Sequence, residues 1–360
     1  MQKFASNTKI YTGRGSLSVL KTLVKGKLLV VTDPYFMKNG TAQRIAGLSG
    51  AAQVQYFDQV QPDPEVTLAA KGASAVQAFG PDTVLALGGG SAMDCAKAMT
   101  YFSGSAATLI AVPTTSGSGS EVTDFSILTH DGIKHPLVDE KLVPQAAILD
   151  GELLDSLPGS LIADTGFDAL SHALEACAAT GASAITDSLA QGAFCTVMDC
   201  LEASFRGDKA VRQSIHEASC MAGMAFSQAG LGLCHALAHS LGGLYHLPHG
   251  RLNAILLPAV VDFNASAAGY KYAHIARLAG IGGASDTMAV RSLKAALVRL
   301  RRLLALPGSL QEAGVEPARL VGDMELICKA ALEDGCIVTN PVPVTKQDIC
   351  HILHRVKSRG

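Results

Sequence analysis

Short aliphatic and β-branched runs alternate with helix-like patterns up to about residue 150, and this alternation constrains the fold of the 360-residue chain more than any other feature. The runs predict strands over residues 27–32, 53–57, 83–87 and 108–112. Between them, apolar residues at helical spacing predict helices over residues 41–48, 64–79 and 91–102. Strands that alternate with helices form a parallel sheet covered on both faces, so we expect an α/β fold here.

The second half of the chain shows almost no strand pattern. A hairpin over residues 127–138, with Asp131-Gly132 as its turn, and a short strand over 147–149 close the first part. Beyond them the spacing predicts helices over residues 163–179, 184–205, 209–226, 233–244, 252–263, 268–278, 289–306 and 317–332. We therefore expect an α/β domain over residues 1–157 and an all-α domain over 158–360, with a ligand in the cleft between them.

The composition indicates a folded chain with no nucleic-acid or membrane partner. Hydrophobic residues make up 48% and charged residues 17%, enough to bury a core. The 29 basic and 31 acidic residues give a net charge of -2, whereas nucleic-acid binders carry a basic face. No apolar run reaches the ~18 residues that span a bilayer, and residues 1–20 do not resemble a signal peptide. The nine cysteines contain no C-x-x-C pair, so we expect reduced thiols and a cytoplasmic protein.

A glycine-rich segment, residues 88–94 (GGGSAMD), directly follows a predicted strand and opens a helix. Glycines allow close approach of a ligand, and the first helical N–H groups carry about half a positive charge. The segment therefore suits a pyrophosphate, although Met93 breaks the G-x-G-x-x-G pattern. A tight turn capped by Ser91 is the alternative. A second glycine pair, Gly13 and Gly15, lies in a polar stretch and predicts only a turn.

Two further features of the first half suit a nucleotide. Residues 113–121 (PTTSGSGSE) follow a strand and offer many hydroxyls for a sugar or a nicotinamide amide, or else form a solvated loop. Asp33 ends another strand, where a carboxylate can accept hydrogen bonds from a ribose diol. An isolated Asp there is more often a helix cap or turn residue. Because Asp33 precedes the glycine loop, the standard Rossmann order does not fit.

The helical half contains candidate metal ligands. Asp168 and His172 stand four positions apart in an apolar helix, so both side chains share one face, and a buried Asp needs a partner. Four of the eleven histidines fall within fifteen positions, namely His235, His239, His246 and His249. The neighbours of His249 are Pro248 and Gly250, so it is expected in a turn. Imidazoles with a carboxylate favour Fe²⁺ or Zn²⁺ over Mg²⁺ or Ca²⁺. Core histidines with ordinary hydrogen bonds are the alternative, and spacing does not show which histidines bind.

Taken together, these motifs resemble the iron-dependent (group III) alcohol dehydrogenases. The resemblance rests on residues 88–97 (GGGSAMDCAK), 113–123 (PTTSGSGSEVT), 165–176 (TGFDALSHALEA) and 230–258 (GLGLCHALAHSLGGLYHLPHGRLNAILLP). Residues 224–232 and 246–250 are most similar to the propanol dehydrogenases of propanediol utilisation. The resemblance implies an N-terminal dinucleotide-binding α/β domain of modified Rossmann type, with a parallel sheet, and an all-α C-terminal metal-binding domain.

The resemblance also implies roles for individual residues. The metal ligands are Asp168, His172, His235 and His249, with His239 beside the metal as the catalytic histidine. The cofactor-binding residues are Asp33, Gly89, Gly90, Ser91, Asp94, Thr114, Thr115 and Ser118, and Lys97 completes the glycine-loop motif. The substrate pocket is formed by Phe125, Ile127 and Phe226. One departure is Asn340-Pro341-Val342, which stands where the family commonly has Asn-Pro-Arg.

The implied activity is NAD-linked interconversion of short primary alcohols and aldehydes, such as propanol and propanal or ethanol and ethanal. The implied metal is Fe²⁺, with Zn²⁺ as the alternative. The implied assembly is a homodimer or larger homo-oligomer, with association with a bacterial microcompartment. Alternatives are a polyol dehydrogenase, a dehydroquinate-synthase-like lyase, or an inactive scaffold protein. A lyase of that kind needs several basic side chains around its substrate, and the intact motifs argue against a scaffold.

Overall fold

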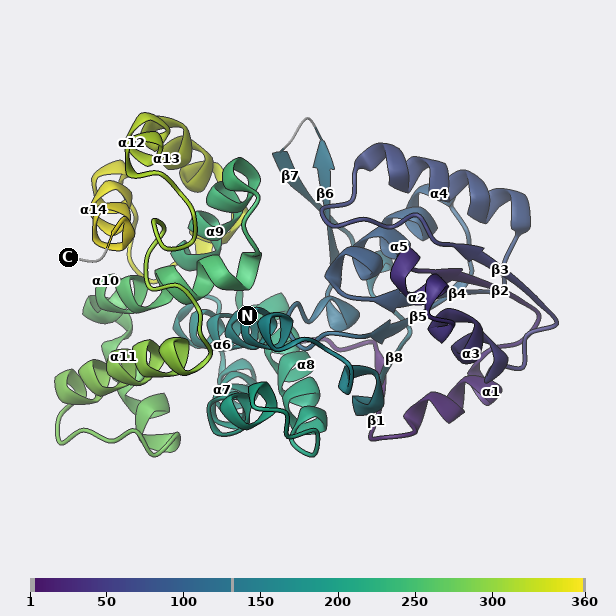
Figure 1. The fold of residues 1–360 in the computed structure, drawn as a ribbon, viewed down its shortest axis with the longest axis horizontal. Helices are drawn as coiled ribbons and strands as arrows, with labels where there is room; N and C mark the ends of the chain where they lie inside the picture. The colour runs from purple at the N-terminus through teal and green to yellow at the C-terminus, as the bar shows by residue number, and fades with distance from the viewer. Residues whose placement is uncertain (1–3, 131–132, 359–360) are drawn as a thin grey trace. The chain divides into compact units, whose positions relative to one another are not determined.

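The computed structural model describes residues 4–130 and 133–358. The chain divides into two compact units, one of residues 5–157 and a second that begins at Pro158 (Figure 1).

The first unit is built on a six-stranded sheet in the order β1-β8-β5-β4-β2-β3, in which every neighbouring pair is parallel. The strands are β1 (Lys9–Thr12), β2 (Lys27–Val31), β3 (Gln53–Phe57), β4 (Thr83–Gly88), β5 (Thr108–Pro113) and β8 (Ala146–Leu149). The helices are α1 (Leu20–Leu23), α2 (Pro34–Lys38), α3 (Thr41–Gly47), α4 (Val66–Phe79) and α5 (Gly90–Ser103). The predicted parallel α/β fold is thus confirmed.

Both faces of the sheet are buried, which explains why its central strands are apolar throughout. Along β2, Leu28 and Val30 belong to one core cluster with residues of α1 and α3, whereas Leu29 and Val31 belong to another with residues of α4 and α5. Successive side chains of a strand point to opposite faces, so each central strand supplies both cores.

Strand β1 is an element that the sequence pattern did not predict. It is four residues long, mostly exposed and at the edge of the sheet, where it pairs with the buried strand β8. The turn expected at Gly13 and Gly15 does follow it, with φ of 115° and 81°. A strand at the edge of a sheet pairs with one neighbour only. Because β1 is also mostly exposed to solvent, it does not need an apolar pattern.

The predicted hairpin forms from β6 (Phe125–His130) and β7 (Ile133–Val138), which are antiparallel. It begins two residues before the expected start. Its proposed turn, Asp131-Gly132, lies outside the described residues.

In the second unit the described elements are helical. They are α6 (Gly159–Ala178), α7 (Ala184–Phe205), α8 (Arg212–Ala229), α9 (Leu233–Tyr245), α10 (His249–Leu278), α11 (Asp286–Leu303), α12 (Pro317–Gly322), α13 (Met324–Glu333) and α14 (Lys346–Val356), with short 3₁₀ turns such as η5 (Gly335–Thr339). Helix α6 is buried from Gly166 to its end and packs against α7, α8 and α10. The most enclosed helix therefore carries the candidate ligands Asp168 and His172.

The prediction of two helices over 252–263 and 268–278 was wrong, because α10 runs unbroken through both. Pro258 lies inside it and removes one backbone donor. The polar Asn264 does not interrupt the helix either, since its amide exchanges two 2.9 Å hydrogen bonds with the Asn340 amide. Of the described helices, α10 alone has the length and composition to cross a membrane, and 61% of its most apolar window is buried inside the protein.

The reverse error occurs near the C-terminus. One helix was predicted over residues 317–332, but α12 and α13 are separated at Asp323, whose carboxylate accepts a 3.0 Å hydrogen bond from the Tyr245 hydroxyl. Helix α14 was not predicted, although Thr345 and Asp348 form a capping box at its start.

Candidate active site

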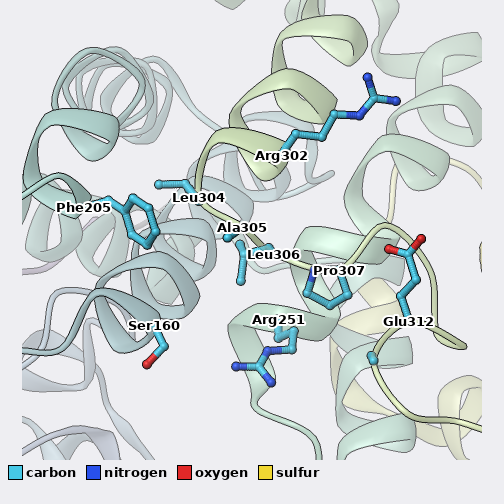
Figure 2. Close-up of a pocket in the computed structure, with 10 residues that line it drawn as sticks. Ser160, Phe205, Arg251, Arg302, Leu304, Ala305, Leu306, Pro307 and Glu312 are labelled. Atoms are coloured by element: carbon cyan, nitrogen blue, oxygen red, sulfur yellow. The ribbon is translucent and has the colours of Figure 1, made fainter.

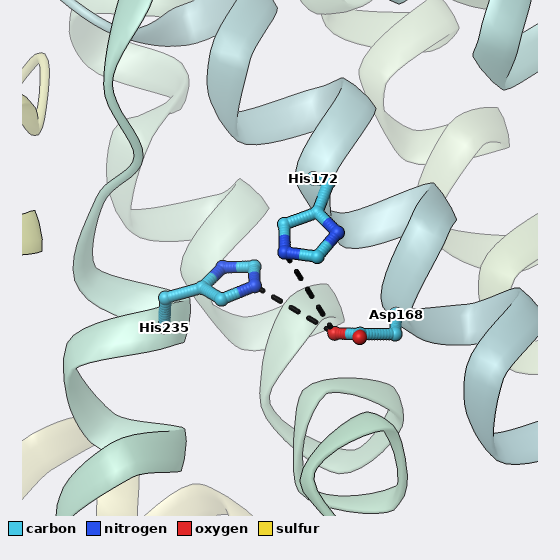
Figure 3. A group of neighbouring side chains, drawn as sticks. All are labelled: Asp168, His172 and His235. Carbon is cyan, nitrogen blue, oxygen red and sulfur yellow. Dashed lines mark ion pairs between the residues drawn. The ribbon is translucent and has the colours of Figure 1, made fainter. Parts of the chain in front are cut away.

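Three imidazole nitrogens converge on one carboxylate oxygen in the helical unit. The distances to Asp168 Oδ1 are 4.0 Å from His172 Nε2, 3.7 Å from His235 Nε2 and 3.5 Å from His249 Nε2. Figure 3 shows Asp168 and His172 projecting from one helix toward His235 on another. These four residues are called the Asp–His cluster below.

His249 reaches the cluster from the start of a helix rather than from the turn expected for it. It is the first residue of α10. The chain turns there because His246 ends α9 in the left-handed conformation, with φ of 54°. A Cβ on Gly250 would lie 1.8 Å from the Asp164 carbonyl oxygen, so only glycine lets α10 begin against the backbone of α6. His246 itself is exposed and has no place in the cluster.

The charges of the cluster are coupled. Burial raises the pKa of Asp168, but His172, His249 and His235 together outweigh it and hold the pKa of that carboxyl well below its usual range. The carboxylate is therefore ionised. One oxygen and three imidazole nitrogens around a common point form a donor set that fits Fe²⁺ or Zn²⁺.

Glu175 contacts His235 at Nδ1, the ring nitrogen that does not face Asp168, and the sequence analysis did not identify it. Its carboxylate is buried and contacts His235 Nδ1, while it accepts hydrogen bonds from the N–H groups of Cys234 at 2.7 Å and His235 at 3.3 Å. Burial lowers the pKa of His235, but Glu175 and Asp168 raise it overall to about 9. A signal for Glu175 existed, because it follows Asp168 by seven positions on the same helix face.

Asn253, one turn after His249 on α10, was also missed. Its Nδ2 donates to Asp168 Oδ1 at 2.9 Å and lies 3.2 Å from His249 Nε2 and 3.4 Å from His235 Nε2. It therefore holds the carboxylate oxygen on which the three imidazoles converge.

His239 lies beside the cluster rather than in it. Its ring stacks on that of His249, with centroids 5.1 Å apart and planes at 15°. Its Nδ1 is 2.8 Å from Asp334 Oδ2. The predicted pocket residue Phe226, on α8, stacks on His172 with centroids 4.3 Å apart, so it lies against a cluster side chain.

The glycine loop of the first unit joins β4 directly to α5. Gly89 precedes the helix, which begins at Gly90, so the alternative of a Ser91 cap is wrong, and the cap residue Gly89 has no side chain that could bond the first N–H groups. A Cβ on Gly89 would lie 3.2 Å from Thr115 Oγ1, and one on Gly90 would lie 3.2 Å from Ser118 Oγ. The two predicted nucleotide segments therefore touch at these glycines. Thr114 joins them through its N–H, which donates to the Gly88 carbonyl at 2.9 Å.

Asp33 caps a helix, as one of the two interpretations expected, and it also lies beside the glycine loop. Its Oδ1 caps α2 by accepting from the N–H groups of Tyr35 at 2.9 Å and Phe36 at 3.1 Å. Its Oδ2 faces the glycine loop, 3.9 Å from where a Cβ on Gly88 would be. One carboxylate oxygen thus remains beside the loop.

Asp94 and Lys97 support the second segment from α5. Asp94 Oδ1 accepts from Ser120 Oγ at 2.7 Å, and burial raises the pKa of Asp94 to about 6. Lys97 is buried and donates three 2.9 Å hydrogen bonds, to both Thr123 oxygens and to the Phe125 carbonyl. Burial lowers the pKa of Lys97 to about 8. Both residues therefore fix the loop that carries Ser118, a function that the sequence did not distinguish from direct cofactor contact.

The remaining predicted pocket residues, Phe125 and Ile127, belong to β6 in the first unit. They are partly buried and share one face of the strand, while Ser126 and Leu128 between and beyond them are buried. Their lining of a common pocket with Phe226 stays a prediction.

A separate hollow of about 720 Å³ lies in the helical unit. It is lined by residues such as Phe205, Arg251, Arg302, Leu306 and Glu312 (Figure 2). None of the predicted site residues lines it. Its lining residues include no histidine, aspartate or cysteine, and Arg251 is paired with Asp164 at 3.0 Å, so the hollow does not resemble the Asp–His cluster.

A dinucleotide-type α/β unit joined to a helical unit with an Asp–His cluster defines a class of metal-dependent oxidoreductases. Family models agree: "Iron-containing alcohol dehydrogenase" matches residues 7–151, and "Fe-containing alcohol dehydrogenase family, C-terminal" matches residues 162–357. The chain belongs to the iron-containing alcohol dehydrogenase family, whose members interconvert alcohols and aldehydes. The resemblance inferred from the motifs is thereby confirmed.

Relatives align along nearly the whole chain. An NADPH-dependent butanol dehydrogenase of Clostridium saccharobutylicum is 37% identical over 99% of this chain and 98% of its own length. The 1-propanol dehydrogenase PduQ of Salmonella typhimurium is 38% identical over 99% and 100%. Among solved structures, 1,3-propanediol oxidoreductase has a TM-score of 0.93 at 32% identity over 99% and 100%. A sulfoacetaldehyde reductase from Bifidobacterium kashiwanohense, in complex with NAD⁺, has a TM-score of 0.89 at 27% identity over 100% of both chains.

Proposed function

We propose that this chain is an NAD-linked, iron-dependent dehydrogenase of short primary alcohols, with propanol and propanal or ethanol and ethanal as substrates. The observation that carries the proposal is the convergence of three imidazole nitrogens on Asp168 Oδ1, beside His239 and Phe226. When bound, the nicotinamide exchanges hydride with the carbinol carbon and the metal polarises the oxygen on that carbon.

The residues that hold the metal are Asp168, His172, His235 and His249. Glu175 accepts the Nδ1 proton of His235 and so orients its Nε2 toward the cluster. Fe²⁺ is the proposed metal and Zn²⁺ the alternative, since both suit this donor set.

The nucleotide is proposed to bind the glycine loop with its phosphates at the uncapped start of α5, where the helix dipole favours negative charge. Gly89, Gly90 and Ser91 supply the close approach, and Thr114, Thr115 and Ser118 supply contacts to the ribose and nicotinamide. Asp33 Oδ2 is proposed to accept from the adenosine ribose and so to select NAD. One relative is NADPH-dependent, so cofactor choice varies among similar proteins and Asp33 makes it testable here.

The substrate is proposed to lie against Phe226, which stacks on His172, with Phe125 and Ile127 completing an apolar pocket. Relatives named for butanol and 1-propanol support a short aliphatic chain. Discrimination among such chains is weak, because one methylene is worth only about 1–3 kcal/mol. His239 is proposed to accept the alcohol proton in oxidation and to return it in reduction.

We further propose a cytoplasmic homodimer or larger homo-oligomer that associates with a bacterial microcompartment. The similarity to two proteins named 1-propanol dehydrogenase PduQ, together with the resemblance of residues 224–232 and 246–250 to propanol dehydrogenases of propanediol utilisation, supports the association with a microcompartment.

The decisive experiment measures NADH oxidation over an aldehyde series from ethanal to butanal, together with the iron and zinc content of the protein. We expect turnover with propanal, loss of activity in air and its recovery with ferrous iron. Equal recovery with Zn²⁺ and no sensitivity to oxygen would contradict iron as the working metal. No NADH oxidation with any aldehyde would favour the lyase or scaffold alternatives.

A further inference from the structure

A hydrogen-bonded pair lies beside the Asp–His cluster, formed by His239 on α9 and Asp334 at the start of η5, which are 95 positions apart. We propose that Asp334 is a positioning residue that holds His239 in the tautomer whose Nε2 exchanges a proton with the alcohol. This inference rests on the proposed function, because it assigns a partner to the proposed proton acceptor.

The carboxylate of Asp334 is itself fixed in place. Its Oδ1 accepts from the Cys336 N–H at 2.8 Å and thereby caps η5, while its Oδ2 lies 2.8 Å from His239 Nδ1. Its two oxygens therefore have separate partners, one in the backbone and one in the imidazole. The side chain is only 19% exposed, so water competes weakly for the pair.

The protonation state of Asp334 decides where the shared proton lies. Burial raises its pKa, but the hydrogen bonds from His239 and Cys336 lower it overall to about 2. An ionised carboxylate only accepts hydrogen bonds, so the proton is on His239 Nδ1. A neutral His239 then carries its lone pair on Nε2.

The ring of His239 has few other constraints. It stacks on His249 and meets His235 edge-on, with centroids 6.1 Å apart, but stacking does not distinguish one ring nitrogen from the other. Among the described residues, the hydrogen-bond partner of this ring is Asp334. Without its carboxylate, the ring can flip and the proton can move to Nε2, which then cannot accept.

The proton balance of the reaction uses this arrangement. In oxidation the alcohol O–H proton passes to His239 Nε2 while a hydride leaves the carbinol carbon for NAD⁺, giving aldehyde, NADH and an imidazolium. The ionised Asp334 neutralises the imidazolium until Nε2 releases its proton to water. Reduction runs the same transfers in reverse, and Asp334 keeps its charge throughout.

The test compares Asp334→Asn and Asp334→Glu in the full-length, iron-loaded enzyme. Asparagine keeps the size but removes the charge, so we expect kcat to fall at least about tenfold with the aldehyde KM within about twofold. Asp334→Glu should recover most of kcat. Asp323→Asn is the matched control, because Asp323 also accepts from an α9 side chain, Tyr245, but lies outside the pair.

A second measurement does not depend on turnover. Long-range ¹H–¹⁵N correlation spectra of the zinc-loaded enzyme, with the His239→Gln variant for assignment, should show a proton on Nδ1 of His239 in the wild type and its loss from that atom in Asp334→Asn. Unchanged kcat and an unchanged tautomer in Asp334→Asn would overturn the proposal, as would loss of bound metal from that variant, which would mark a purely structural role. A wild type that oxidises no NADH would instead refute the proposed function, while the spectra would still test the pair.

Discussion

Replacing Glu175 tests whether the buried carboxylate behind His235 strengthens metal binding. In Glu175→Gln, one side-chain oxygen remains for the Cys234 N–H, 2.7 Å away in the wild type, but an amide NH₂ would face His235 Nδ1, which then has no acceptor. Loss of such a partner costs about 10- to 100-fold in metal affinity, which corresponds to about 1.4–2.7 kcal/mol. Glu175→Ala should also destabilise the metal-free fold, because each buried donor left unpaired costs about 1–3 kcal/mol.

The assay is competition for Fe²⁺ with a chromophoric chelator under anaerobic conditions, paired with denaturant unfolding of the metal-free proteins. Glu202→Gln is the matched control, since Glu202 pairs with an Arg206 side chain that is 64% exposed and touches no cluster residue. If Glu175→Gln bound Fe²⁺ as tightly as the wild type, the reasoning that Glu175 orients and charges His235 would be refuted.

His249→Ala should remove most bound metal and nearly all activity, whereas His239→Ala should keep the metal and lower turnover; elemental analysis showing the opposite pattern would reverse the two assignments. Asp33→Gly should shrink an expected preference for NADH over NADPH of at least about tenfold in kcat/KM, mainly by improving NADPH; equal use of both by the wild type would mean that Asp33 does not face the ribose. Lys97 loses its proton near pH 8 in the folded protein and near pH 10.5 in the unfolded chain. Between these two pH values the unfolded state therefore binds more protons than the folded state. The free energy of unfolding of the wild type, relative to Lys97→Met, should therefore rise with pH across that window, and a flat or falling difference would contradict the burial of a charged amine.

The local patterns of the sequence predicted much of the fold. The strands β2, β4 and β5 were predicted because each is an apolar run that is buried in the sheet, and such runs need no knowledge of their neighbours. The shared helix face of Asp168 and His172 was also predictable, since helical spacing alone places residues four apart together. The glycine loop was predictable from its position between a strand and a helix.

Other features depend on partners that are distant in the chain. Strand β1 forms on the edge of β8, whose paired residues lie 137 positions later, and has no apolar pattern of its own. Helix α10 continues through Asn264 because Asn340, 76 positions away, satisfies its amide. Sequence periodicity reports which face of an element is apolar, but not which polar group of another element will meet it.

The same limit applies to the candidate site. The sequence by itself determined which residue types could bind a metal and a nucleotide, through the motifs that place the chain in its family. Only the tertiary structure decided that Gly250 brings His249 onto the carboxylate of α6, that Glu175 lies behind His235, and that Asp334 meets His239. Each of these depends on the close approach of two helices or loops, and that approach is set by packing of the whole unit rather than by the spacing of residues within one element.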